Sequence, residues 1–194
     1  MSTKFYEQNA QDFFDTTFDV DMGALYTPFL DRLTEGAHIL DAGCGSGRDT
    51  KHFLSLDYQV TAFDASAELV RLATAHTRQP ISQMTFQEMS YAATFDGIWA
   101  CASLLHVPDK DWIDVVGRFC RALKPGGVWY FSFKYGDTAR SKDGRFFRDH
   151  TENSLKDSLT GTPGLELLST WRTQDTRKDR ENESWLNVMA IRQD

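Results

Sequence analysis

Short apolar runs alternate with longer amphipathic stretches along most of this chain. Four such runs predict strands, at residues 37–41, 59–64, 97–101 and 128–133. Between them, apolar residues recur at the spacing of a helix, most clearly at Trp112, Val116 and Phe119. Pro108 and Asp109 open that helix, and the proline and glycines of 124–127 end it. Strands that alternate with helices predict a parallel α/β sheet.

Weaker patterns complete the expected elements. Further strands are expected at 84–87, 165–170 and 185–191, and Ser66 is the expected N-cap of a helix. No helix is expected between the last two strands, and the polar stretch 175–183 is typical of a hairpin connection. The prediction is a doubly wound, seven-stranded, mostly parallel sheet with an antiparallel edge strand and helices on both faces.

The chain is expected to form a single domain over 1–194, since 194 residues are enough for one core. Residues 1–34 contain helically spaced apolar side chains and are predicted to form an N-terminal helical cap. Residues 135–152 are rich in charge and are predicted to be a loop, which is a candidate active-site loop.

The stretch 39–49, ILDAGCGSGRD, carries the strongest chemical signal. A strand ends in Asp41, and Gly43, Gly45 and Gly47 follow at alternate positions before a helix. Glycine lets a ligand approach the bare backbone, and the N–H groups of the following helix can face an anionic group. Asp41 places a carboxylate beside that loop, which favours a ligand with a cationic end over a pyrophosphate.

A dinucleotide is the main alternative ligand for such a loop. Its fingerprint is G-x-G-x-x-G followed by an acidic residue. Here Gly47 comes one position early and Arg48 occupies the last position, where helix packing requires a small residue. No G-K-[ST] follows, which argues against a nucleoside triphosphate.

A sulfonium nucleoside with an amino-acid tail matches the charges better. Asp41 and the glycine loop would face the amino-acid end, and Asp64 would accept hydrogen bonds from the ribose hydroxyls. Glu88 or Met89 would lie near the adenine edge. The carboxyl ends of neighbouring strands bring these residues to one crevice, at the switch point of the sheet.

The whole-chain composition narrows the classes of function. The net charge of −7 argues against broad nucleic-acid binding. No apolar stretch is long enough to span a membrane, so a membrane partner is not expected. Three scattered cysteines predict no disulfide framework and no metal site, and they favour a cytoplasmic protein. The oligomeric state is left open.

With these motifs in hand, the chain resembles the class I S-adenosylmethionine-dependent methyltransferases. The resemblance is carried by ILDAGCGSG, FDAS, FDGIWA and LKPGG, in the family's order over residues 37–133. GSGRD, IWACASLLHVP and SFKYG are similar to a group of small bacterial methyltransferases of type 11/12, some of them tellurite-resistance-like. The resemblance implies a Rossmann-like fold, S-adenosylmethionine as cofactor and S-adenosylhomocysteine as product.

The resemblance also implies roles for individual residues. Its implied cofactor contacts are Asp41, Gly43, Gly45, Gly47, Arg48, Asp64, Ala65, Ser66, Glu88, Met89, Cys101 and Ala102. The first four match the part that holds the methionine moiety, and Asp64 matches the ribose ligand. Cys101 and Ala102 would form the floor beneath the methyl group. FQEM, which contains the implied adenine contacts Glu88 and Met89, departs from the family's usual acid-bearing pattern.

Methyl transfer needs alignment of nucleophile, carbon and sulfur, and it needs a general base only if the acceptor arrives protonated. His106 is the first candidate base, because it follows a strand near the expected methyl position. Tyr6 and Tyr135 are candidates to close over the acceptor. A run of basic residues could attract an anionic acceptor: Lys134, Arg140, Lys142, Arg145 and Arg148.

Three functions remain open from the sequence. The first is methyl transfer to a small-molecule acceptor, which could be anionic. The second is methylation of RNA or protein through the basic stretch 134–148, although the acidic balance makes nucleic acid unlikely. The third is a non-catalytic protein that only binds S-adenosylmethionine, because an intact glycine loop predicts binding and not turnover.

Overall fold

A computed structural model describes residues 2–176, 180 and 183–193. Its centre is a seven-stranded sheet in the order β3-β2-β1-β4-β5-β9-β8. The strands of this sheet are β1 (His38–Ala42), β2 (Gln59–Asp64), β3 (Ser82–Gln83), β4 (Phe95–Ala100), β5 (Leu123–Lys134), β8 (Leu165–Gln174) and β9 (Ser184–Arg192). The α/β prediction and the seven strands are thereby confirmed.

The strand order places a switch point between β1 and β4. The chain runs outward from β1 through β2 to β3 and then returns to the other side of β1 to form β4. Neighbouring strands from β3 to β5 pair in parallel, and β9 pairs antiparallel with both β5 and β8. The reversed strand therefore lies one position inside the edge, because the final hairpin inserts β9 beside β5.

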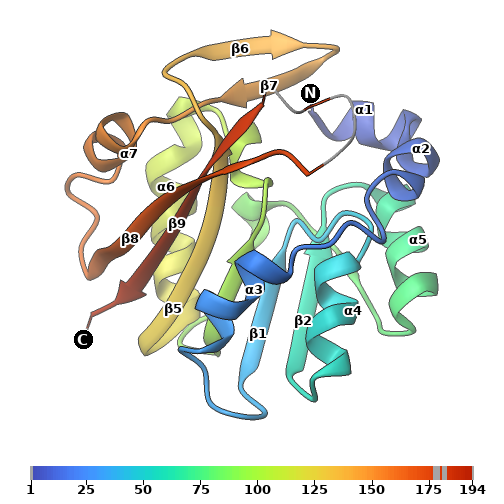
Figure 1. Ribbon diagram of the computed structural model, residues 1–194, viewed down its shortest axis with the longest axis horizontal. Helices are drawn as coiled ribbons and strands as arrows, with labels where there is room; N and C mark the ends of the chain where they lie inside the picture. The colour runs from blue at the N-terminus through green and yellow to red at the C-terminus, as the bar shows by residue number, and fades with distance from the viewer. Residues whose placement is uncertain (1, 177–179, 181–182, 194) are drawn as a thin grey trace.

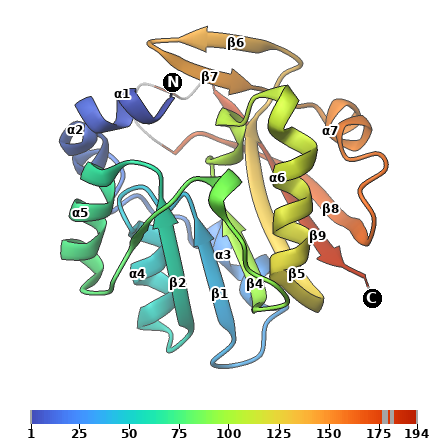
Figure 2. The same ribbon diagram turned by 180° about the vertical axis from the view of Figure 1, so that it is seen from behind.

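Helices cover both faces of the sheet (Figures 1 and 2). The α-helices are α1 (Ser2–Gln8), α2 (Ala10–Asp15), α3 (Gly23–Leu30), α4 (Arg48–Ser55), α5 (Ala67–Thr77), α6 (Asp109–Ala122) and α7 (Glu152–Ser158). On one face, α3 and α4 bury Phe29 and Phe53 against Trp99. On the other face, α6 buries Phe119 against Trp129. Ser66 caps α5 as predicted, accepting a hydrogen bond from the Leu69 amide.

One predicted strand differs from the structure, and one predicted connection can be compared with it only in part. The strand expected at 84–87 is instead the short β3 followed by a 3-10 turn, Phe86–Glu88. The Glu88 carboxylate accepts from the Thr85 amide and hydroxyl, and this capping box favours the turn. The connection expected at 175–183 lies partly outside the described residues.

The stretch 135–152 is also not a plain loop. It contains the hairpin β6 (Ala139–Lys142) and β7 (Arg145–Arg148), and α7 begins at its end. Asp143 and Gly144 join the two strands, both with positive φ, as a two-residue hairpin turn requires. In Figures 1 and 2 this hairpin lies beside α1 at one end of the sheet. The N-terminal helices and the hairpin therefore share the end of the molecule where the glycine loop lies.

Candidate active site

A cavity of about 900 Å³ lies at the carboxyl ends of the strands. Its lining comes from the N-terminal helices, the glycine loop, the end of β2, the segment 84–87 and residues 101–108. The hairpin, the end of β8 and the start of β9 complete its walls. This is the crevice that the switch point of an open α/β sheet predicts for a ligand.

The glycine loop after β1 forms one wall. Gly43 has a φ of +75°, and a Cβ there would lie 2.7 Å from Cβ of Ser103. Gly43 and Gly45 line the cavity. Gly47 does not line it, because it packs against α5, where a Cβ would lie 2.8 Å from Cγ2 of Thr77. Gly43 and Gly45 therefore expose backbone to the cavity, whereas Gly47 lets α4 and α5 approach each other.

Asp64 ends β2 and lines the cavity beside Ala65 and Ser66. Its two carboxylate oxygens accept hydrogen bonds from the backbone N–H groups of Gly45 (3.0 Å) and Ser66 (2.9 Å). Burial raises the pKa of Asp64, and these backbone hydrogen bonds partly offset the rise. The carboxylate is thus held in a fixed orientation, with further acceptor capacity on each oxygen.

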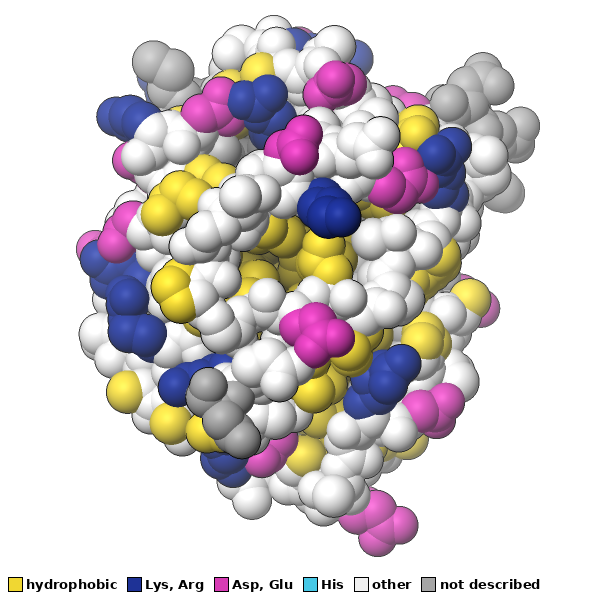
Figure 3. Space-filling model, turned by 90° about the vertical axis from the view of Figure 1, so that its left-hand side faces the viewer, with side chains coloured by type: hydrophobic (Ala, Val, Ile, Leu, Met, Phe, Trp, Pro, Cys, Tyr) yellow, Lys and Arg dark blue, Asp and Glu magenta, His cyan; other side chains and the backbone are white. Residues whose placement is uncertain are grey.

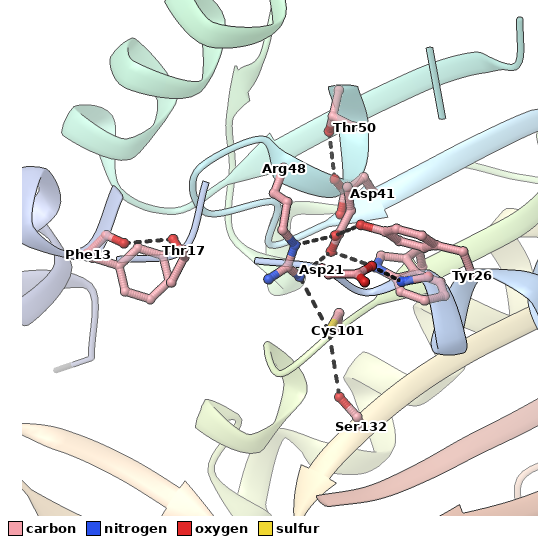
Figure 4. Close-up of polar contacts among 12 residues, drawn as sticks. Phe13, Thr17, Asp21, Tyr26, Asp41, Arg48, Thr50, Cys101 and Ser132 are labelled. Atoms are coloured by element: carbon pink, nitrogen blue, oxygen red, sulfur yellow. Dashed lines mark hydrogen bonds and ion pairs between the residues drawn. The ribbon is translucent and has the colours of Figure 1, made fainter. Parts of the chain in front are cut away.

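Asp41 lies outside the cavity lining. It is 2% exposed, and its carboxyl accepts a hydrogen bond from the Thr50 hydroxyl (2.6 Å), as Figure 4 shows. Burial and the nearby Asp49 carboxylate raise the pKa of Asp41, which favours its neutral form. The expectation that Asp41 puts a fixed negative charge at the ligand is therefore not met, because the side chain turns inward to Thr50 on α4.

Asp49 is a buried carboxylate that keeps its charge, and it was not among the site residues expected from the sequence. Arg48 binds both of its oxygens, and Tyr26 and Trp99 each donate one further hydrogen bond. Burial works against ionisation, but Arg48 and these hydrogen bonds hold the pKa of Asp49 below its usual value. The sequence signal for this ion pair was the adjacent, oppositely charged pair Arg48-Asp49 in the first turn of α4.

Arg48 and the end of β4 form the floor of the cavity. The Arg48 guanidinium is 3.9 Å from Sγ of Cys101, and the Ser132 hydroxyl approaches the same sulfur (Figure 4). Ser132 also accepts a hydrogen bond from the Ala102 amide, and Ala102 has a φ of +51°. All four residues line the cavity, as was expected of Arg48, Cys101 and Ala102.

Glu88 and Met89 lie apart from the cavity lining. Glu88 is exposed and caps the 3-10 turn, and Met89 is 1% exposed within the core beneath α6. The residues that reach the cavity from this segment are the four preceding them, 84–87. The expected positions were displaced because the chain turns at Thr85 rather than extending as a strand.

Tyr6 and His106 meet across the cavity, although they are 100 residues apart. Nδ1 of His106 lies 2.6 Å from the Phe146 carbonyl oxygen, which can only accept, so Nδ1 carries the proton. Nε2 then accepts the hydrogen bond from the Tyr6 hydroxyl, at 2.8 Å. Burial lowers the pKa of His106 to about 4, so the imidazole is neutral at physiological pH.

Tyr135 does not line the cavity. Its hydroxyl donates to Glu152, and the guanidinium of Arg172 stacks 3.8 Å above its ring. Among the basic residues of 134–148, Lys134 and Arg145 line the cavity. Within the described ranges, no group of three or more His, Cys, Asp or Glu is arranged to hold a metal ion.

The inward position of Asp41 gives a test by pH. A carboxyl with a raised pKa in the folded state binds its proton more tightly there, so stability is lost as pH rises above the unfolded value of about 4. Asp41→Asn cannot titrate and still accepts from Thr50, so the variant should gain on the order of 2 kcal/mol relative to wild type between pH 5 and 8. Urea unfolding without ligand measures the difference in unfolding free energy between the two proteins. A difference that does not change with pH would contradict the raised pKa of Asp41 in the folded state.

Residues 39–127 match a family model described as a methyltransferase domain. The ubiquinone biosynthesis O-methyltransferases of Xanthomonas campestris pv. campestris and Xanthomonas oryzae pv. oryzae are 33% and 35% identical to this chain over 104 residues. Each match covers 50% of this chain and 43% of the relative. The chain thus matches less than half the length of these curated relatives.

Solved structures agree with the fold. The 1,6-didemethyltoxoflavin-N1-methyltransferase of Burkholderia thailandensis, solved with S-adenosylhomocysteine bound, has a TM-score of 0.82 at 24% identity, covering 99% of this chain and 87% of that one. The [4+2]-cyclase SpnF has a TM-score of 0.77 at 17% identity, covering 98% of this chain and 94% of that one. At these identities the likeness shows the fold alone.

The family match covers residues 39–127, under half of the chain, and identifies this part as similar to a methyltransferase domain. The fold of the chain is that of the class I S-adenosylmethionine-dependent methyltransferases. The cofactor of that family is S-adenosylmethionine, with S-adenosylhomocysteine as product. Among the described residues no helix is long and apolar enough to cross a membrane.

Proposed function

We propose that this chain binds S-adenosylmethionine in the cavity at the switch point and transfers its methyl group to a small-molecule acceptor. The observation that carries the proposal is the placement of Asp64 and the glycine loop on one wall of that cavity, hydrogen-bonded to each other through the Gly45 amide. An acidic residue fixed in this way can accept from a vicinal diol with both oxygens.

The remaining cofactor contacts follow from the cavity lining. Gly43 and Gly45 offer backbone to the methionine moiety, and the Arg48 guanidinium offers charge to its carboxylate. Ala65 and Ser66 flank the adenine together with the segment 84–87. Cys101 and Ala102 form the floor near the methyl group. In this proposal, four residues support the site from behind its lining: Asp41, Gly47, Glu88 and Met89.

Tyr6 and His106 are proposed to position the acceptor. Both side chains line the cavity, and the hydrogen bond from the Tyr6 hydroxyl to Nε2 of His106 fixes their orientation relative to each other. Tyr135, bonded to Glu152 outside the cavity lining, acts at most on the wall behind the site. We expect the cap formed by residues 1–34 to exclude water during transfer, since α1 and α2 line the cavity.

Two observations favour a small acceptor over RNA or protein. A cavity of 900 Å³ is within the range of small-molecule sites, which suits a cofactor and a compact acceptor. The face drawn in Figure 3 carries intermixed basic and acidic side chains rather than a continuous basic patch. Cytoplasmic location is part of the proposal and rests on the free thiols of Cys44, Cys101 and Cys120.

Turnover with labelled S-adenosylmethionine tests the whole proposal. The acceptors offered would be a panel of small hydroxy-aromatics and heterocycles, bulk tRNA and a protein extract. Label transfer to a small molecule supports the proposal, whereas transfer only to tRNA or protein favours those alternatives. Binding of the cofactor without transfer to any of them would favour a non-catalytic binding protein.

Thermal denaturation gives a direct test of the cofactor. S-adenosylhomocysteine at about 100 times its Kd should stabilise the protein by about 2.7 kcal/mol, which raises Tm by roughly 5–10 °C for a chain of this size. NAD at the same concentration should leave Tm unchanged, because Arg48 stands where a dinucleotide loop needs a small residue. A larger shift with NAD would favour the dinucleotide interpretation.

A further inference from the structure

Two cations that line the cavity lie near the same aromatic ring, Phe147. Nζ of Lys134 is 5.9 Å from the centre of the Phe147 ring, and Cζ of Arg145 is 5.1 Å from the same centre. All three residues line the cavity. Like charges gathered on one wall of a cavity repel each other unless a negative group compensates them.

The other basic residues of this stretch pair with carboxylates or face solvent, although Cζ of Arg140 also lies 5.3 Å from the centre of the Phe147 ring. Arg140 pairs with Asp149, and Arg148 pairs with Asp109. Lys142 is exposed on the hairpin, and none of these three basic residues lines the cavity. The basic stretch is therefore divided by the fold, and only part of it can act on a ligand.

The charges that face the cavity are incompletely neutralised by the protein. Among the described residues, the carboxylate oxygen nearest to the Arg145 guanidinium belongs to Asp143, at 3.5 Å, on a side chain that is 57% exposed. Nε of Arg145 is buried without a hydrogen-bond partner among the described residues. Lys134 and Arg180 share the single carboxylate of Glu183. An anionic ligand would supply the missing partner.

Aromatic rings form the walls around the same charges. The Arg145 guanidinium lies 3.8 Å above the Phe5 ring, and Tyr6 and Phe147 line the cavity beside it. Aromatic rings beside a guanidinium favour a planar ligand, because a flat ligand can stack on the rings and on the guanidinium plane.

The neighbouring imidazole is poorly suited to remove a proton. Burial, together with the charges of Arg145 and Lys134, lowers the pKa of His106 to about 4. A simple phenol has a pKa near 10, as tyrosine does, so transferring its proton to His106 would be unfavourable by a factor of about one million. Tyr6, on the other side of the imidazole, donates its hydrogen to Nε2.

We infer that the acceptor is a small planar anion, an acidic hydroxy-aromatic compound that enters the site already ionised and is held by Arg145 and Lys134. This inference rests on the proposed methyl transfer. The electron pair of the anionic oxygen forms the O–CH₃ bond as the S–CH₃ bond breaks, and the sulfur keeps that bond's electrons as a neutral thioether. An anion and a sulfonium cation give two neutral products, so the transfer step releases no proton and needs no base.

Binding of matched probes to the protein saturated with S-adenosylhomocysteine tests the inference. The probes are 4-nitrophenolate, at a pH where it is ionised, and the neutral 4-nitroaniline, which has nearly the same shape. We expect the phenolate to bind at least tenfold tighter in calorimetry. Arg145→Gln should reduce this preference to about twofold or less, whereas Arg145→Lys should retain most of it.

Lys142→Gln is the matched control, because it removes one positive charge from the same hairpin without touching the cavity. It should keep the full preference for the phenolate. Equal binding of the two probes, tighter binding of 4-nitroaniline, or no binding of 4-nitrophenolate to the loaded wild-type protein would each overturn the inference. Failure of S-adenosylhomocysteine itself to bind would instead overturn the proposed function, so the two failures are distinguishable.

Discussion

Asp49→Ala should be the most destabilising of the substitutions considered. The variant leaves the buried Arg48 guanidinium without its counter-charge and removes the acceptor of Tyr26 and Trp99. Breaking a buried ion pair by removing one partner costs about 3–5 kcal/mol. For a chain of this size that corresponds to a decrease in Tm of roughly 6–20 °C, measured by thermal denaturation without ligand.

The control is Asp114→Ala, which breaks the exposed pair with Arg118 on α6. An exposed pair of this kind contributes about 0.5 kcal/mol, so the Tm of Asp114→Ala should be almost unchanged from wild type. Because the pKa of Asp49 is lowered in the folded state, its contribution is present above the unfolded pKa of about 4 and is lost as pH falls further. Similar decreases in the two variants would show that the Asp49 cluster contributes no more than a surface pair.

Asp64→Ala should weaken S-adenosylhomocysteine binding by about 10- to 100-fold. The variant removes the proposed acceptor of the ribose hydroxyls, and hydrogen bonds to a charged group are worth about 1.5–3 kcal/mol. It also frees the Gly45 amide, which the carboxylate now holds. Isothermal titration calorimetry measures the affinity, and circular dichroism checks that the fold is retained.

Glu68→Ala serves as the control for Asp64, since it removes an exposed carboxylate from the first turn of α5 that does not line the cavity. Its affinity for S-adenosylhomocysteine should equal that of wild type. Unchanged affinity in Asp64→Ala would remove the ribose assignment. A tenfold loss in Glu68→Ala would indicate a general electrostatic effect instead.

Most elements of the fold could be predicted because each is determined by nearby residues. β2 occupies the range expected, and α6 begins at Asp109 as the Pro108-Asp109 pair indicates. The hairpin at 139–148 was missed although Asp143-Gly144 is a strong local signal for such a turn.

The candidate site was predictable only in part. Gly43, Gly45 and Asp64 lie on the cavity as their positions at strand ends suggested. Met89 and Glu88 do not, because β3 ends at Gln83 and the chain then turns at Thr85. Arg145 and Lys134 were in the predicted basic stretch, but the stretch alone could not separate them from Arg140 and Arg148.

The sequence by itself determined the alternation of strands and helices and the glycine loop, since hydrophobic periodicity and backbone freedom are local properties. The tertiary structure decided which charges keep a partner and which face the cavity. Asp49 is bonded by Tyr26, 23 residues away, and by Trp99, 50 residues away, while Asp41 turns inward to Thr50. Desolvation and pairing depend on what surrounds a charge in three dimensions, and those neighbours come from distant parts of the chain.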